Sequence, residues 1–125
     1  SENGGPGAGV ACDAAGRVDG RLALWRLDAG GSWTEATGLP AIAVGDTDPL
    51  AAPVEFGGAR TTVLPDGDDL TLLRAEGDRW TVRRVTGPTG RVTALAVAGN
   101  VLYLVAGPDA DHRGLWRADL SALTG

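Results

Sequence analysis

Apolar side chains occur along most of this chain in short runs that polar or glycine-containing turns separate. Two such runs, residues 92–98 and 101–105, flank the dipeptide Gly99-Asn100. Runs of this length around a two-residue turn predict a β-hairpin, because glycine supplies the positive φ that the turn requires. Both runs are apolar at odd and even positions alike, which predicts strands that are buried on both faces.

The same pattern recurs upstream and predicts about ten strands in all. Helix signals are weak throughout, including the short Ala- and Leu-containing stretch 118–123. The longest predicted loop is 40–53. The predicted strands lie near residues 10–12, 21–27, 32–36, 54–56, 61–64, 70–74, 80–85, 92–98, 101–105 and 115–117.

A five-residue string returns three times, and its starts are 48 and 43 residues apart. In both complete copies a Trp-Thr pair follows the string, and a Thr-Gly pair closes the unit. A period in the forties that spans four predicted strands indicates a repeat architecture. The three strings are Leu24-Trp25-Arg26-Leu27-Asp28, Leu72-Leu73-Arg74-Ala75-Glu76 and Leu115-Trp116-Arg117-Ala118-Asp119.

The length of 125 residues suits one domain, which we expect to consist of an incomplete unit over about 1–40, a complete unit over 41–88 and an incomplete unit over 89–125. The formal charge of −5 argues against a nucleic-acid partner. No apolar run approaches the ~20 residues of a transmembrane helix. The stretch 1–7 has neither the basic nor the apolar region of a signal peptide.

Four-stranded antiparallel units of this length resemble the blades of β-propellers, which pack face to face. The first hairpin is also similar to the Asp-box of the bacterial neuraminidase repeat, Ser/Thr-x-Asp-x-Gly-x-Thr-Trp. Asp28, Gly30, Ser32 and Trp33 occupy positions of that pattern, whereas Arg26 replaces its opening Ser/Thr. The second copy keeps only two of these positions (Gly77 and Trp80), and the third keeps Asp119 alone.

The resemblance implies that the Asp carboxylate accepts hydrogen bonds from turn N–H groups while the Trp packs beneath it. Proteins with this repeat include sialidases, sortilin-like receptors, photosystem assembly factors and many uncharacterised secreted proteins. An extracellular or cell-envelope location is therefore implied by the resemblance alone. Function does not transfer across so diverse a set.

A sialidase-type site would need an arginine cluster, a Tyr nucleophile with a Glu partner, and an Asp acid/base. Arg26, Arg74 and Arg117 hold equivalent repeat positions and either converge around an axis or each pair with a local carboxylate or stack on a Trp. Tyr103 is the only tyrosine, and its apolar neighbours favour a packed strand position. We assign no catalytic residue.

Three acidic clusters offer oxygen ligands of the kind that calcium prefers, although Asp and Gly also dominate ordinary turns. His112, the only histidine, is expected in an exposed loop rather than as a general base. Cys12 stands alone, which excludes an intrachain disulfide and favours a small buried side chain over a nucleophile. We assign no metal or cofactor ligand. The acidic clusters are Asp46/Asp48, Asp66/Asp68/Asp69 and Asp109/Asp111.

The four tryptophans are Trp25, Trp33, Trp80 and Trp116. On an exposed face such rings stack on sugars, but their repeat positions favour packing between sheets. They therefore bear on both the fold and the function.

These patterns predict an all-β fold of about three propeller-like blades in a partial ring, with a β-sandwich as the alternative. The leading functional hypothesis is a non-enzymatic binding or scaffold module that displays loops such as Ala43–Pro53 and Gly107–Gly114 to a protein or glycan. One alternative is a degenerate sialidase-like propeller that binds or cleaves a glycan. Another is a structural half of an oligomeric propeller, in which a second copy, or the remainder of a longer chain, completes the ring.

Overall fold

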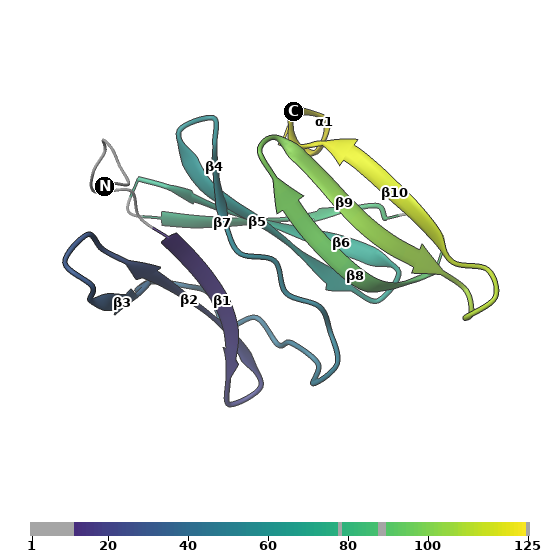
Figure 1. The fold of residues 1–125 in the computed structure, drawn as a ribbon, viewed down its shortest axis with the longest axis horizontal. Coiled ribbons are helices and arrows are strands. Elements are labelled where there is room, and N and C mark those ends of the chain that lie inside the picture. Colours follow the sequence, from purple (N-terminus) through teal and green to yellow (C-terminus); the bar gives the residue numbers. More distant parts are fainter. Residues whose placement is uncertain (1–11, 78, 88–89, 125) are drawn as a thin grey trace.

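The computed structural model describes residues 12–77, 79–87 and 90–124. Within them, ten strands form three antiparallel sheets, and strands that are consecutive in sequence are neighbours in each sheet. Figure 1 shows the middle sheet lying between the other two. The prediction of an all-β fold is therefore confirmed.

The first sheet contains β1 (Cys12–Val18), β2 (Arg21–Leu27) and β3 (Trp33–Glu35). The middle sheet contains β4 (Val54–Phe56), β5 (Ala59–Asp66), β6 (Asp69–Glu76) and β7 (Arg79–Val85). The third sheet contains β8 (Arg91–Ala98), β9 (Val101–Gly107) and β10 (Gly114–Asp119), and it is followed by the short helix α1 (Leu120–Thr124).

Tight turns connect the strands where the sequence predicts or permits them. The hairpin around Gly99-Asn100 is confirmed, because Ala98 ends β8, Val101 begins β9 and Gly99 has a φ of 61°. The β1–β2 turn uses Asp19 and Gly20, whose φ values of 54° and 75° match the two left-handed positions of a type I′ turn.

The middle sheet is buried on both faces, because neighbouring residues on one strand point to opposite sides. On one side, Leu64 and Leu73 pack in a core shared with Leu22 and Leu24 of the first sheet. We call this the first core. On the other side, a second core contains side chains of the middle and third sheets: Val63, Leu70, Leu72, Val92, Leu102, Leu104, Ala106 and Leu120.

The prediction that residues 92–98 and 101–105 are buried on both faces is wrong. Along β9, Leu102 and Leu104 are buried in the second core, whereas the alternate side chains Tyr103 and Val105 are only half-buried. The alanines of β8 that share this other face are exposed. Apolar composition predicts which residues are able to be buried, but burial also requires a packing partner, and no described element covers this face.

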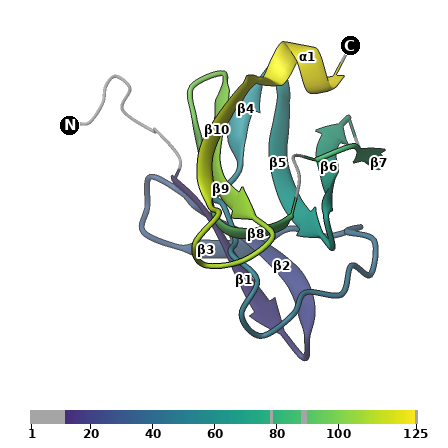
Figure 2. The ribbon, with the colours of Figure 1, turned by 90° about the vertical axis from the view of Figure 1, so that its right-hand side faces the viewer.

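The loop between β3 and β4 includes the predicted loop 40–53 and extends the first sheet beside β2. The Leu22 N–H donates to Ile42 O and the Val44 N–H donates to Gly20 O, both at 2.9 Å. Arg17 of β1 also donates hydrogen bonds to the carbonyl oxygens of this loop. Figure 2 shows the loop running alongside β1 and β2 on its way to β4.

A short helix forms at 120–124, in a stretch where the sequence carries only weak helix signals. Leu120 is fully buried in the second core, and its N–H donates a 2.8 Å hydrogen bond to Asn100 O. Tertiary packing therefore stabilises this single turn, since a helix of five residues is too short to form on its own. Among the described residues, no helix has the length and apolar character needed to span a bilayer.

Candidate functional site

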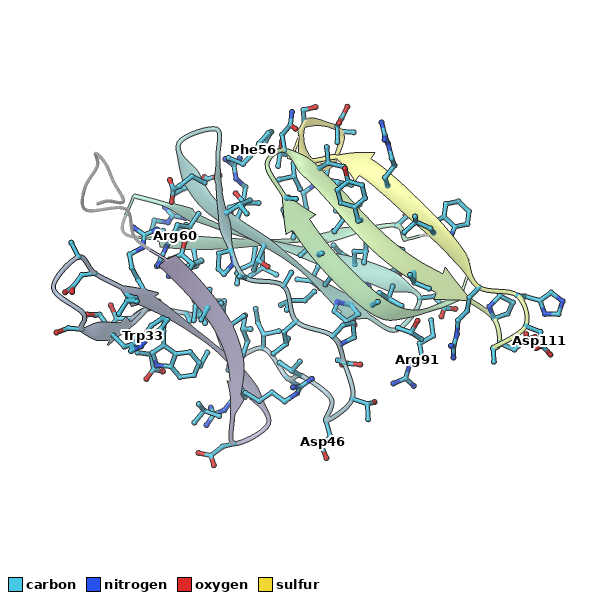
Figure 3. The ribbon with its side chains drawn as sticks, in the orientation of Figure 1. Trp33, Asp46, Phe56, Arg60, Arg91 and Asp111 are labelled. Atoms are coloured by element: carbon cyan, nitrogen blue, oxygen red, sulfur yellow. The ribbon has the colours of Figure 1, made fainter. Side chains whose placement is uncertain are left out.

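The richest group of charged side chains lies between the first and middle sheets. Asp13 is opposite Arg26 in the first sheet, and Glu55 is opposite Arg60 in the middle sheet. The two pairs meet across the gap, because Arg26 also contacts Glu55 (3.3 Å) and Arg60 contacts Asp13 (3.6 Å). Figure 3 places Arg60 near the start of β1, as these contacts require. We call these four residues the ionic quartet.

Asp13 is the buried centre of the ionic quartet. Its side chain is only 8% exposed, and it accepts hydrogen bonds from Arg26 Nε (2.9 Å) and Nη2 (3.1 Å). The hydrogen bond to Asp13 raises the pKa of Arg26 above its ordinary value, against the lowering effect of partial burial. Arg26 therefore stays charged at every pH at which the protein is handled.

A cleft of about 370 Å³ opens beside the ionic quartet and is lined by Arg26, Arg60, Asp28 and Glu35 among others. Arg60 also lies over the Trp80 ring, with 5.3 Å between the guanidinium carbon and the ring centroid. The two guanidinium groups already face two carboxylates, so the quartet is neutral as a whole. This arrangement fastens one sheet to the next, and in this role it needs no ligand.

Two of the repeat arginines, Arg26 and Arg74, are held by local partners, which confirms that interpretation for these two. Arg74 donates to Thr61 Oγ1 (3.2 Å) and Phe56 O (2.7 Å), and it lies 5.8 Å from the centroid of the Phe56 ring. Arg117 is exposed on β10, opposite Tyr103. Tyr103 is half-buried on the open face of the third sheet rather than in a core.

The acidic clusters are engaged in turns and ion pairs. Asp48 accepts a 2.9 Å hydrogen bond from the Gly45 N–H, and Arg84 lies within 3.4 Å of carboxylate oxygens of both Asp66 and Asp69. Among the described residues, no three His, Cys, Asp or Glu side chains are grouped as a metal site would need.

His112 lies in the exposed loop between β9 and β10, as expected. Its Nδ1 is 2.7 Å from Asp109 Oδ1, and that carboxylate also accepts the Asp111 N–H at 2.9 Å. The loop tip projects from the body of the molecule near Asp111 (Figure 3). Cys12 begins β1, but its side chain lies outside the described part of the structure.

The tryptophans divide into two groups. Trp80 packs at the first core, so the prediction of inter-sheet packing is confirmed for it. Trp116 lines a hollow of about 220 Å³ between the middle and third sheets but is 47% exposed. Trp25 and Trp33 line an open hollow of about 290 Å³ with Ala14. Trp33 is 55% exposed, so it does not pack beneath the Asp28 turn as the Asp-box resemblance implies.

Two open faces thus flank the three sheets. The first outer face is the side of the first sheet that carries Ala14, Gly16, Val18, Arg21, Ala23, Trp25, Leu27, Trp33 and Glu35. The third outer face is the side of the third sheet that carries Ala94, Ala96, Ala98, Val101, Tyr103, Val105, Leu115, Arg117 and Asp119. Both are mainly apolar, and Leu115 is 76% exposed.

The sequence did not indicate that Asp13, Arg60 and Arg91 connect separate parts of the fold through ion pairs and hydrogen bonds. Arg91 of β8 donates a 3.0 Å hydrogen bond to Thr47 Oγ1 and so ties the third sheet to the loop before β4. No local signal could have identified these residues, because their partners lie on a neighbouring strand, on another sheet or in the loop before β4.

Comparison of the chain with protein-family models, curated proteins and solved structures finds no match.

Proposed function

We propose that this protein is a non-enzymatic binding or scaffold module, built from propeller-like sheets, whose outer faces bind protein. The observation that carries the proposal is the exposure of large apolar side chains on both outer faces. Leu115 is 76% exposed on the third outer face, while Trp33 (55%) and Val18 (45%) are exposed on the first. Large apolar side chains that gather on an exposed face are typical of interaction sites.

The charged residues support the same proposal. The guanidinium groups of Arg26 and Arg60 face carboxylates at 3.6 Å or less, and Arg74 is occupied by Thr61 and Phe56. Such pairing suits a structural role, whereas a substrate carboxylate would need guanidinium groups that are free to receive it.

Photo-crosslinking tests the proposal. A photoreactive amino acid replaces Leu115 or Trp33 in cells that make the protein, and Ala110, in the exposed loop before β10, serves as the control position. We expect a defined protein adduct from the two face positions and none from position 110. The adduct is identified by mass spectrometry and its binding is repeated with purified components. Absence of any adduct from either face would contradict the proposal.

A second candidate function, glycan binding, is favoured by the pair Trp25 and Trp33. Their rings line an apolar hollow of about 290 Å³, and indole rings stack on the apolar faces of sugars. Titration with sialylated and neutral oligosaccharides would quench or shift tryptophan fluorescence, and Trp33→Ala would abolish the response. An unchanged spectrum at millimolar glycan would exclude this candidate.

A further inference from the structure

The internal repeat relates positions on the two outer faces to positions that are buried inside the stack. Leu24, Leu72 and Leu115 are the first residues of the three repeated strings. Leu24 is 0% exposed in the first core and Leu72 is 3% exposed in the second core, where each faces the sheet that follows it in sequence. Leu115 has the same position on the third sheet but is 76% exposed. The third outer face is therefore the face that, in the other two sheets, covers the next sheet.

The opposite relationship holds for the second residue of each string. Leu73 is 0% exposed and faces the first sheet, and Trp116 lines the hollow that faces the middle sheet. Trp25 is the equivalent residue on the first outer face. The first outer face is therefore the face that, in the other two sheets, receives the preceding sheet.

Strand register extends this equivalence to Trp33. Trp33 is paired with Leu27 in the first sheet, and Trp80 is paired with Ala75 in the middle sheet. Leu27 and Ala75 are the fourth residues of their strings, so the two indoles are structurally equivalent. Trp80 packs at the first core, against the preceding sheet, whereas Trp33 has no such cover among the described residues and is 55% exposed.

At both internal interfaces, the face that carries the first residue of one string packs against the face that carries the second residue of the next string. The third outer face is an uncovered face of the former kind, and the first outer face is an uncovered face of the latter kind. The two outer faces also differ in side-chain size, such that small side chains on one would lie opposite large ones on the other. The third outer face has a row of alanines on β8 (Ala94, Ala96, Ala98), and the first has the bulky rings of Trp25 and Trp33. Small side chains opposite large ones allow close packing of two layers.

We propose that a second copy of this chain packs its first outer face against the third outer face, head to tail, and continues the stack with the geometry of the internal interfaces. This inference rests on the proposed function, since it names the partner of the same surfaces. A contact between unlike faces is heterologous, and it closes into a ring only if the rotation from one copy to the next returns to the first copy.

The test uses light scattering with two charge variants. The purified protein is expected to move from 12.7 kDa towards twice that mass as its concentration rises. Leu115→Glu removes the third outer face and Trp33→Glu removes the first, so each variant alone should lose roughly 30-fold or more in association. Ala110→Glu adds the same charge at an exposed loop position and should leave association unchanged.

Mixing the two variants separates head-to-tail packing from packing of like faces. In an equimolar mixture, the intact first outer face of Leu115→Glu meets the intact third outer face of Trp33→Glu, so a mixed pair should form although neither variant associates alone. If only one of the two substitutions prevents association, like faces are in contact and the proposal is overturned. A constant mass of 12.7 kDa for the unmodified chain overturns it as well.

Two further variants protect the test against misfolding. If circular dichroism shows that either protein is unfolded, Tyr103→Arg replaces Leu115→Glu and Val18→Glu replaces Trp33→Glu, with the same expectations. The crosslinking experiment distinguishes the two levels of inference. An adduct from position 115 or 33 with a different protein contradicts self-association but supports a protein-binding function, whereas no adduct contradicts both.

Discussion

Leu72 and Leu73 are neighbours on β6, and both are almost inaccessible to solvent, yet they belong to different cores. Leu72 packs with the third sheet at 3% exposure, and Leu73 packs with the first sheet at 0%. Alternation along the strand sends the two side chains to opposite faces of the middle sheet. This sheet is therefore the layer on which the other two depend, and its two faces can be perturbed independently.

Truncation of either leucine should destabilise the protein strongly. Leu72→Ala and Leu73→Ala each remove a buried side chain and leave a cavity, so each should lower the free energy of unfolding by about 2–5 kcal/mol in denaturant titrations. Val82→Thr, at a position that is 51% exposed on β7, is the control and should change it by about 0.5 kcal/mol or less. Equal effects of all three substitutions would contradict the two-core description.

Asp13→Asn should weaken the contact between the first and middle sheets. The substitution leaves Arg26 and Arg60 without the carboxylate that they share, and we expect a loss of about 1–3 kcal/mol in the free energy of unfolding. Asp66→Asn breaks an exposed pair with Arg84 and should cost at most about 1 kcal/mol. A smaller effect at Asp13 than at Asp66 would show that the ionic quartet does not fasten the sheets.

Gly107→Ala should disturb the junction between β9 and the following loop. A Cβ at this position would lie 2.1 Å from His112 O, which forces backbone to move and should cost about 1–3 kcal/mol. Gly114→Ala is the matched control, because its Cβ would only reach ordinary contact, 3.5 Å from Trp116 Nε1. Thermal unfolding of both variants measures the difference, and equal melting temperatures would contradict the close approach.

Asp28→Ala should loosen the β2–β3 turn. Asp28 Oδ1 accepts hydrogen bonds from the N–H groups of Gly30 and Ser32, both at 2.9 Å. Their loss should cost about 1 kcal/mol and speed amide exchange at these two residues. Asp28→Asn keeps an acceptor oxygen and should exchange more slowly than Asp28→Ala. Exchange measured by NMR compares the three proteins, and unchanged rates in Asp28→Ala would contradict the role of the carboxylate.

Much of the local structure could be predicted from the sequence. The hairpin at Gly99-Asn100, the strands of the middle sheet and the loop before β4 all depend on neighbouring residues, whose turn chemistry and apolar pattern are visible in the chain. The exposed position of His112 followed in the same way from its polar neighbours. Helix α1 did not, because its formation depends on burial of Leu120 against the third sheet.

The candidate site was much less predictable. The repeat positions of Arg26 and Arg74 are visible in the sequence, but their partners Asp13, Glu55 and Thr61 are not, because these partners lie across a strand or a sheet and their spacing carries no local signal. The burial of residues 92–98 could not be predicted for the same reason, because the sequence does not show which face of a strand has a packing partner.

By itself, therefore, the sequence determined most of the strands, the turns and the repeat, which all arise from interactions between residues close in the chain. The first strand is an exception, because it was expected near residues 10–12 and β1 runs over Cys12–Val18. Only the tertiary structure decided which apolar faces are closed and which remain open. Leu24 and Leu115 hold the same place in the repeat, yet one is fully buried and the other is 76% exposed. The physical reason is that burial requires two surfaces that pack together, and the residue at one position contributes to only one of those surfaces.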